Sequence, residues 1–465
     1  MDPRDRVIAG LLLEIAALRA EVAELKARLG QNSTNSSRPP SSNSPGAVPP
    51  RTREPSGRRR GGQPGHKKHE RRLLPPERLD AVHTIKPRAC RRCGDALFGC
   101  DPEPYRHQII EVPRVIARGV EYQLHALRCK RCQITTRAQL PDGVTSLMVG
   151  PRLQAIAAVC SGAYRLSKRM VEELLSDFLD ADISLGSVAN LEQHTSEAVA
   201  PAVDEARAEV RAAPVKHADE TSWREAKQKA WLWVAATATV AVFLIRRSRA
   251  TAVARELLGE VFHGILNSDR WSAYNWIRTD VRQICWAHLK RHWRAFEDHG
   301  PAARGIGKAL QIATEALFAH WYRARDGTLK WSSFREYARP LQREIVGLLR
   351  DGQVCPSKKV AGMCREILEL EDALWTFIRR PDVDPTNNAA ERAIRHAVIW
   401  RKTSHGTDSE AGSRFVERML TVVQTLRMQR RNVLDYVTAA CEAAIHGQAP
   451  PSLLPVTSRI QAAAA

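Results

Sequence analysis

The sequence predicts a multidomain α+β protein. Three features indicate this: an apolar heptad pattern near the N-terminus, two CxxC pairs further along, and strand-like runs that alternate with helical ones beyond Pro214. A chain of 465 residues is long enough for several domains, each with its own core.

The chain is strongly basic. It has 71 Lys and Arg against 51 Asp and Glu, a formal net charge of +20. This excess favours a polyanionic partner, and nucleic acid rather than a membrane surface. Glu14 interrupts the N-terminal apolar run, which argues against a secretory signal, and the uncharged run 230–245 is shorter than the roughly 20 residues of a spanning helix. We therefore expect a cytoplasmic protein that associates with nucleic acid.

An apolar seam recurs at alternating steps of three and four near the N-terminus. Its members are Ile8, Leu11, Ile15, Leu18, Val22, Leu25 and Leu29. This is the a/d pattern of a coiled coil, and the alternative is an amphipathic helix docked on its own domain. We expect self-association through this segment, with the number of chains left open.

The next segment is rich in Ser, Asn, Pro and Gly and ends in a basic run. Such a composition cannot bury enough apolar surface to order itself. Between Arg51 and Arg72 it carries nine Lys or Arg and two Glu. Arg58, Arg59 and Arg60 could follow DNA phosphates in a minor groove, and a merely solubilising linker is the alternative.

Two CxxC pairs predict a structural zinc site in a zinc ribbon. The expected ligands are Cys90, Cys93, Cys129 and Cys132. Strand-like runs at His107–Val112 and Val120–Leu127 lie between the pairs, and Arg and Lys around them suit a DNA-facing module. Unrelated reduced thiols are the alternative interpretation.

Residues 145–205 are predicted to be helical, with a break at Asp180–Ser184. Two helices across a short turn are typical of a helix-turn-helix, although any helical hairpin gives the same pattern.

Beyond Pro214 two aspartates are each expected to end a strand. Asp219 follows a predicted strand at 215–218, and Asp269 follows one at 264–268. Between them we expect strands at 231–236 and 240–246 and a helix at 250–258. Strand ends of such a sheet meet at the crevice where ligands bind, so both carboxylates should face one point.

A third carboxylate, Glu391, lies in the stretch DPTNNAAERAIR. Asp384 and Pro385 are predicted as the N-cap and first residue of a helix. On that helix Glu391 shares a polar face with Arg395, and an ordinary ion pair between them is the alternative to a site. The opposite face is small and apolar and should pack on the sheet: Ala390, Ala393, Ile394 and Ala397.

Three clustered carboxylates suit a pair of magnesium ions about 4 Å apart, which can activate a hydroxyl and stabilise a leaving oxygen at phosphorus. Without metals the three acids would repel one another, and at least one would take up a proton.

Four motifs, HADETSW, NSDRWSAYN, CWAHLKRHW and NNAAERAIR, resemble those of the transposases of the insertion sequence sixty-six family, in the same order. The coiled coil, the GGQPGHKKH segment, the CxxC pairs and the helix-turn-helix also follow that family's order. The resemblance implies a ribonuclease-H-like α/β core with the triad Asp219, Asp269 and Glu391. It also implies two magnesium ions per site, a multimer that bridges two DNA ends, and accessory proteins of the same element.

By this resemblance the enzyme cuts the ends of its mobile element and joins the 3′ ends to target DNA. A catalytically inactive zinc-dependent DNA-binding regulator, or a nuclease without strand transfer, stay as alternatives. The expected domains are a coiled coil at 1–30, a linker at 31–75, a zinc ribbon at 80–140, a helix-turn-helix at 145–205, the core at 210–405 with a helical insertion at about 280–380, helices at 406–447 and a frayed tail at 448–465.

Further residues near the acids are assigned as follows. Cys285 and His288 form a CxxH pair similar to a family motif, and we expect a buried Cys with a hydrogen-bonded His rather than a zinc site. Trp271 and Trp286 are expected to pack in the core, with stacking on an unpaired base as the alternative. Four cations are expected to hold DNA phosphates: Arg392, Arg395, Arg401 and Lys402.

Overall fold

The structure is a computed structural model that describes residues 11, 14–19, 21–22, 25–26, 29 and 73–455. The chain divides into two units, one formed by Val48–Ile116 and the other by Met1–Ala47 with Ala117–Ala465. Within the described part of the chain, no helix has the length and apolar character that a membrane crossing needs.

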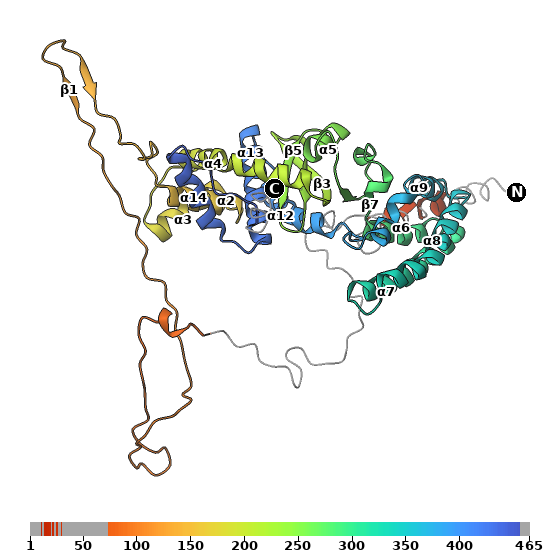
Figure 1. Cartoon of the computed structure of the whole chain (residues 1–465), viewed down its shortest axis with the longest axis horizontal. Helices are drawn as coiled ribbons and strands as arrows, with labels where there is room; N and C mark the ends of the chain where they lie inside the picture. The colour runs from red at the N-terminus through yellow and green to blue at the C-terminus, as the bar shows by residue number, and fades with distance from the viewer. Residues whose placement is uncertain are drawn as a thin grey trace. The chain divides into compact units, whose positions relative to one another are not determined.

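The larger unit is built around a five-stranded mixed sheet (Figure 1). Its strand order is β5-β4-β3-β6-β7. The first three strands are antiparallel, whereas β6 and β7 run parallel to β3. The strands are β3 (Val215–Glu225), β4 (Gln228–Ala236), β5 (Ala241–Arg246), β6 (Ile265–Ser268) and β7 (Arg282–Ile284).

Side chains of β3 alternate between the two faces of this sheet, as the pleat requires. His217 bonds to the start of α12 (Asn388–Ser404), whereas Lys216 donates to the Arg211 carbonyl at the end of α4 (Leu185–Ala212). The small side chains that α12 turns inward, among them Ala390 and Ala397, are fully buried. Helix α12 therefore covers one face, and α4 with α5 (Thr251–Leu258) covers the other.

The outer edge of β5 is covered by side chains of α13 (Glu410–Met428) rather than by another strand. Alternate backbone N–H groups of β5 donate to side-chain oxygens one helical turn apart. The pairs are Ala241 with Thr425, Phe243 with Thr421, and Ile245 with Glu417. The helix partners are four residues apart, a rise of about 6 Å, and the strand donors are two residues apart, a rise of about 6.6 Å. The spacing of the side-chain oxygens therefore matches that of the backbone N–H groups.

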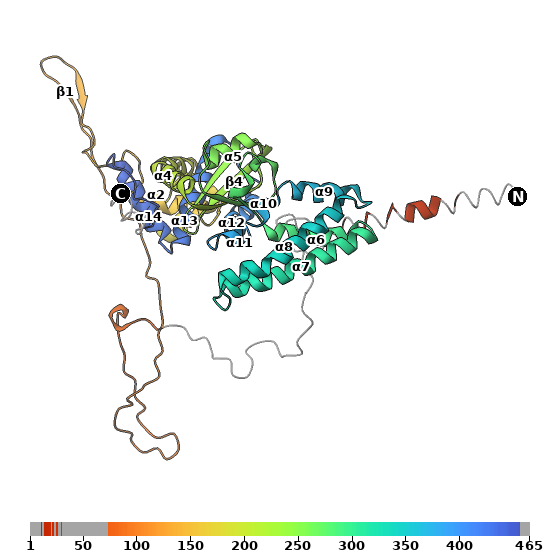
Figure 2. The ribbon, with the colours of Figure 1, turned by 45° about the vertical axis from the view of Figure 1, so that its right-hand side comes forward.

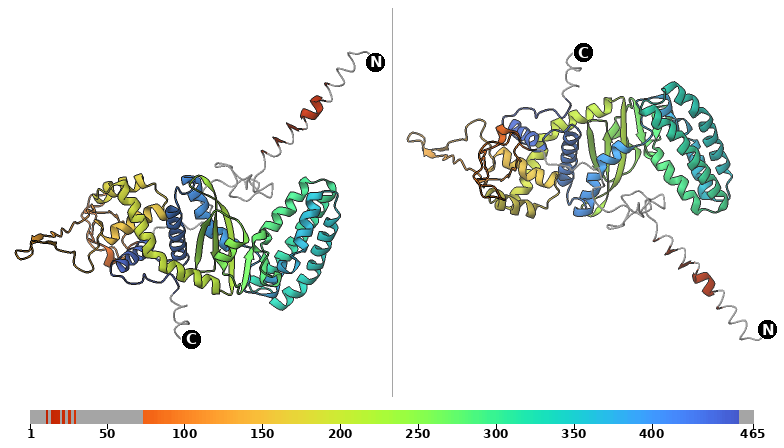
Figure 3. Two further views of the ribbon diagram at one scale, coloured as in Figure 1. Left: turned by 90° about the horizontal axis from the view of Figure 1, so that it is seen from above. Right: turned by 90° about the horizontal axis from the view of Figure 1, so that it is seen from below.

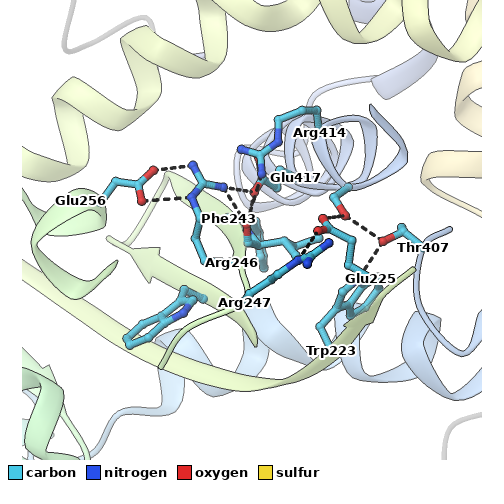
Figure 4. A network of polar contacts seen from close by, with 12 residues as sticks. Trp223, Glu225, Phe243, Arg246, Arg247, Glu256, Thr407, Arg414 and Glu417 are labelled. Atoms are coloured by element: carbon cyan, nitrogen blue, oxygen red, sulfur yellow. Dashed lines mark hydrogen bonds and ion pairs between the residues drawn. The ribbon is translucent and has the colours of Figure 1, made fainter. Parts of the chain in front are cut away.

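Glu417 is buried between two arginines at this edge, as Figure 4 shows. Arg246 Nη1 lies 3.0 Å from its Oε1, and Arg414 Nη1 lies 3.0 Å from its Oε2. The edge that could otherwise pair with another chain is thereby closed.

Helices on the β5 side join the sheet to a helical layer. They are α2 (Pro151–Gly162), α3 (Lys168–Leu179), α4, α13 and α14 (Val433–Ile445). Residues of α2, α4, α13 and α14 belong to the same hydrophobic core as the sheet, while α3 packs with α2 and α4 in a smaller cluster. In the unit's ribbon these helices and the insertion lie on opposite sides of the sheet (Figure 3).

The insertion between β7 and α12 is helical and has its own aromatic core (Figure 2). Trp286 packs against Phe318, Trp375 and Phe377, with ring centroids 5.4–6.1 Å apart. The insertion helices are α6 (Trp286–Ala295), α7 (Pro301–Arg325), α8 (Trp331–Gln353), α9 (Lys358–Leu368), α10 (Glu371–Leu374) and α11 (Thr376–Arg379).

Most elements beyond Pro214 agree with the sequence-based predictions. Strand β7, however, was not predicted, because its residues were assigned to the helix that follows. Nor do residues 107–112 form a strand: in the CxxC region the described strands are β1 (Ala126–Arg128) and β2 (Thr135–Arg137). The predicted frayed tail does not apply to Leu453, which is fully buried, with its carbonyl accepting from Gln429.

The edge bonds of β5 give a testable expectation. Thr421→Val should destabilise the protein by about 1–3 kcal/mol, because the buried Phe243 N–H loses its acceptor. Thr438→Val on α14 is the matched control, since that hydroxyl bonds within its own helix. Urea unfolding measures both, and equal destabilisation of the two variants would contradict a special role for the α13 hydroxyl.

Candidate active site

The register of β3 and β6 sets Asp219 beside Asp269. Val215 pairs with Ile265 and His217 with Asn267, an offset of 50 residues that carries Asp219 to Asp269. Asp269 follows β6 directly, as predicted. The prediction that Asp219 ends its strand was wrong: β3 continues to Glu225, because its partner β4 is longer than β6. Asp219 instead lies just beyond the last β3–β6 pair.

Asn387 fixes the start of the helix that carries Glu391. Its buried side chain donates from Nδ2 to the Ala218 carbonyl at 2.7 Å, next to Asp219, and its Oδ1 lies 3.2 Å from His217 Nδ1. Its backbone N–H lies 3.2 Å from Cys285 Sγ. These bonds hold the first turn of α12 against β3.

The loop before α12 is held by β6 and α6. Asn267 Nδ2 donates to the carbonyls of Asp384 and Thr386 at 2.6 and 3.1 Å, and Trp286 N donates to the Pro385 carbonyl at 2.9 Å. The predicted N-cap at Asp384 was wrong, since α12 begins at Asn388. The carbonyls of 384–386 are engaged by other elements, so the chain cannot turn helical there.

The three carboxylates lie close enough to affect one another's ionisation. The pKa of Asp219 is raised well above its usual value, first by burial and then by the charges of Glu220, Asp269 and Glu391. Burial also raises the pKa of Asp269 and of Glu391. Each aspartate accepts one backbone bond, from Glu220 N at 2.9 Å and from Trp271 N at 2.8 Å. The remaining oxygens form a concentration of negative charge that a bound cation would stabilise.

The opposite face of β3 supports this cluster through Glu220. Tyr274 Oη donates to Glu220 at 2.7 Å, and Arg249 Nε donates to it at 3.0 Å. The Arg249 guanidinium lies between two rings, 3.6 Å from the Trp271 centroid and 4.5 Å from that of Trp231. The sequence did not predict this network. Glu220 and Asp219 are adjacent on β3, so their side chains point to opposite faces of the sheet. The partners of Glu220, Arg249 and Tyr274, are distant from it in sequence.

Glu391 also lies beside the CxxH pair. One potential ligand atom from each of Cys285, His288 and Glu391 lies within 4.8 Å of the other two. Cys285 is buried, as predicted. His288 Nδ1, expected to be hydrogen-bonded, has no hydrogen-bond partner among the described residues and lies 3.6 Å from Glu391 Oε1. Of the two tryptophans, Trp286 is fully buried in the insertion core, and Trp271 is half-buried against Arg249.

Comparison with known proteins identifies the family. The model described as "Transposase IS66 family" matches residues 146–414, more than half of the chain, and includes all three acids. The chain belongs to this family. Residues 2–72 match a family of unknown function, DUF6444.

Two relatives come from Sinorhizobium fredii and are both described as uncharacterized. The protein y4qI is 28% identical over 237 residues, which are 45% of this chain and 43% of the relative. The protein y4hP is 25% identical over 384 residues, which are 74% of this chain and 68% of the relative. The chain thus spans less than half of the first relative's length, and neither name states an activity.

A basic cavity lies at the far end of α12 from Glu391 in this IS66 family member. Its volume is about 850 Å³, and its lining contains no acidic side chain. The lining residues are Ser222, Trp223, Arg224, Lys227, Lys229, Arg401, Lys402 and His405. Arg401, one of the predicted phosphate ligands, is fixed by bonds from Nη1 to Thr221 Oγ1 at 2.9 Å and to the Ser222 carbonyl at 2.8 Å.

The hairpin tip beside this cavity is held rigidly. Ala226 and Lys227 form its two-residue turn with φ of 50° and 64°, a conformation usually taken by Asn or Gly. Ala226 N donates to the Thr407 carbonyl at 2.8 Å, and Thr407 N donates to the Arg224 carbonyl at 3.0 Å. Figure 4 shows Thr407 beside Trp223 and Glu225 at this tip. Lys227 is thus placed by a fixed backbone.

The remaining predicted DNA-binding residues and the heptad segment are only partly described by the structure. Arg392 and Arg395 are exposed on α12, and Arg395 lowers the pKa of Glu391, after the larger effect of Arg291. The alternative considered from the sequence, an ion pair between Glu391 and Arg395, is not formed among the described residues. Arg58, Arg59 and Arg60 lie outside those residues. The described heptad positions from Leu11 to Leu29 are helical and exposed.

Each CxxC pair forms a similar tight turn. Gly94 N donates to the Cys90 carbonyl at 3.0 Å, and Gln133 N donates to the Cys129 carbonyl at 2.8 Å. Backbone N–H groups of the second cysteine of each pair lower the pKa of Cys90 and of Cys129. Both turns therefore favour thiolates, and the joint zinc site remains a prediction.

The anchoring by Asn387 can be tested through stability. Asn387→Ala should cost about 1–3 kcal/mol, because the Ala218 carbonyl loses its buried donor. The exposed neighbour is the control: Asn388→Ala should stay within about 0.5 kcal/mol. Chemical denaturation measures both, and a silent Asn387 variant would contradict the anchoring role.

Proposed function

We propose that this chain is a DNA transposase that cuts the ends of its mobile element and joins the freed 3′ ends to target DNA. The observation that carries the proposal is the β3–β6 register, which sets Asp219 beside Asp269, together with the influence of the Asp269 and Glu391 charges on the pKa of Asp219. Family membership supports the general activity. The three acids extend the proposal to DNA cleavage and strand transfer, because carboxylates that hold two metal ions suit both reactions.

The proposed catalytic core is ribonuclease-H-like and spans about 210–405. Three antiparallel strands followed by two parallel ones, in the order β5-β4-β3-β6-β7, support this assignment. The first acid lies on the central strand, the second follows the neighbouring parallel strand, and the third is on the helix that packs over them. The helical insertion enters after β7 and returns just before α12.

The acids fit a divalent cation of the magnesium class. They offer carboxylate oxygens alone, the ligands that magnesium prefers, and a bound cation would offset the neighbouring charges that raise the pKa of Asp219. Asp219, Asp269 and Glu391 would hold two such ions. When bound, these ions activate the attacking hydroxyl and stabilise the leaving oxygen.

The protein's own groups position the reaction. Hydrogen bonds from the backbone N–H groups of Glu220 and Trp271 orient Asp219 and Asp269. The bond from Asn387 to the Ala218 carbonyl fixes the position of α12 on the sheet, and with it the position of Glu391. Arg392 and Arg395, exposed on the same helix, are proposed to hold the phosphates of the DNA end. The same arrangement would suit both steps: water is the nucleophile in strand cleavage, and a 3′ hydroxyl is the nucleophile in strand joining.

Separate segments are proposed to bind DNA and bring two ends together. The four CxxC cysteines would hold a structural zinc ion, and α3 with α4, joined by the turn 180–184, would act as a helix-turn-helix. The N-terminal heptads are proposed to pair chains. The basic cavity at the hairpin tip adds a rigid surface for the DNA backbone.

Replacing one metal ligand should separate cleavage from binding. Asp269→Asn should lower magnesium-dependent cleavage of labelled element ends by about 100-fold or more, because it removes a charge from the cation site. End binding in a mobility-shift assay should be nearly unchanged.

Asp351→Asn is the matched control, since Asp351 is exposed on α8. An Asp269→Asn variant that cleaves at the wild-type rate would refute the assignment. Strand-transfer products formed by the wild type separate a transposase from a nuclease that only cuts.

The basic cavity predicts a salt-dependent contribution to binding. Lys227→Ala with Lys229→Ala should weaken DNA affinity and reduce the slope of log K against log salt by about 1 for each phosphate that is no longer neutralised. Lys308→Ala, an exposed lysine of α7, should leave the slope unchanged. A titration across several salt concentrations measures this, and an unaltered slope in the double variant would exclude the cavity from DNA contact.

A further inference from the structure

Cys285, His288 and Glu391, termed here the Cys–His–Glu cluster, gather three kinds of metal-binding atom. A sulfur, an imidazole nitrogen and a carboxylate oxygen lie mutually within 4.8 Å. Cys285 and His288 come from the start of α6, and Glu391 comes from the first turn of α12. Two elements far apart in the sequence therefore converge on one point.

Two polar atoms of the cluster are buried without hydrogen-bond partners among the described residues. They are His288 Nδ1 and Glu391 Oε1, which lie 3.6 Å apart. A buried polar atom left unpaired costs about 1–3 kcal/mol, so two facing each other call for a group between them. In its neutral form the imidazole of His288 can offer a lone pair from Nδ1 to a cation.

Backbone N–H groups surround the Cys285 sulfur at the start of α6. Cys285 is the N-cap of that helix, and the Asn387 N–H lies 3.2 Å from Sγ. The N–H groups of His288 and Ala287 also approach the sulfur. A cation that binds sulfur would displace the thiol proton, and those N–H groups would then stabilise the bound thiolate.

We infer that the Cys–His–Glu cluster binds a zinc-class divalent cation, in addition to any magnesium-class ions at the three acids. One sulfur, one nitrogen and one oxygen ligand match zinc, whereas magnesium does not take sulfur. Three protein ligands leave a fourth position for water. The three ligand atoms need only a short adjustment, since they already lie within 4.8 Å of one another.

The two sites share Glu391 through different oxygens. Oε1 lies 3.6 Å from His288 Nδ1, so Oε2 would be the oxygen that serves the proposed acid site with Asp219 and Asp269. A zinc ion on Oε1 would fix the rotamer of the third acid. This inference concerns metal binding alone and does not require that the chain cleave DNA.

Metal content of the full-length protein tests the inference. Wild type, Cys285→Ser and His288→Asn are loaded with zinc, dialysed and measured by mass spectrometry. Each variant should bind about one zinc ion per chain fewer than the wild type. Since the measurement is a difference, any zinc held by the CxxC pairs cancels.

Cobalt(II) in place of zinc gives a spectroscopic readout. The thiolate-to-cobalt absorption of the wild type should decrease in Cys285→Ser and keep its full intensity in Cys160→Ser, a buried cysteine of α2 outside the cluster. Circular dichroism checks folding. If Cys285→Ser does not fold, His288→Asn decides the case, because His288 Nδ1 has no hydrogen bond to the described residues that the change would remove.

Equal zinc content in the wild type and both variants, with unchanged cobalt absorption, would overturn the inference. Magnesium-dependent cleavage by the wild type, measured in parallel, tests the proposed function separately. Loss of zinc in the variants with no cleavage by the wild type would support this site and refute the transposase activity.

Discussion

The structure depends on the buried hydrogen bonds of Asn387. Its side chain joins α12 to the Ala218 carbonyl and to His217 on β3, and its backbone N–H reaches Cys285 at the start of α6. One residue therefore connects the helix of the third acid, the strand of the first acid and the entrance of the insertion. Because each partner is buried, none of these bonds can be exchanged for water without cost.

The same constraint explains how a long insertion is accommodated. Its two ends meet where Trp286 N donates to the Pro385 carbonyl and Asn387 N approaches Cys285. The ends are therefore closed at the sheet, and the helices between them pack around a separate aromatic core. An insertion closed in this way adds little conformational freedom at the acids, so Glu391 keeps its place beside Asp219 and Asp269.

Local pattern predicted much of the fold. Strands β4, β5 and β6, helix α5 and the long insertion helices follow from periodicity and length, and the apolar face of α12 packs on the sheet as expected. Strand β7 escaped prediction because its three residues are buried on both faces and show no alternation. The start of α12 was misplaced because distant donors, Asn267 and Trp286, decide it.

The sequence pointed to the three acids of the proposed site but not to the residues that support them. Aspartates next to strands and a glutamate on a polar helix face are visible in sequence, but Arg249 between Trp231 and Trp271 is a product of tertiary packing. In the same way, the CxxH pair lacked a third ligand until the fold set Glu391 beside it. Contacts between residues distant in sequence carry no local signal.

The central claim is that three carboxylates form one cation site. Crystals of the protein soaked with manganese, a magnesium substitute with anomalous scattering, would test it most directly. The account predicts anomalous peaks bonded to oxygens of Asp219, Asp269 and Glu391. Manganese bound elsewhere, with these three side chains pointing apart and free of metal, would contradict it.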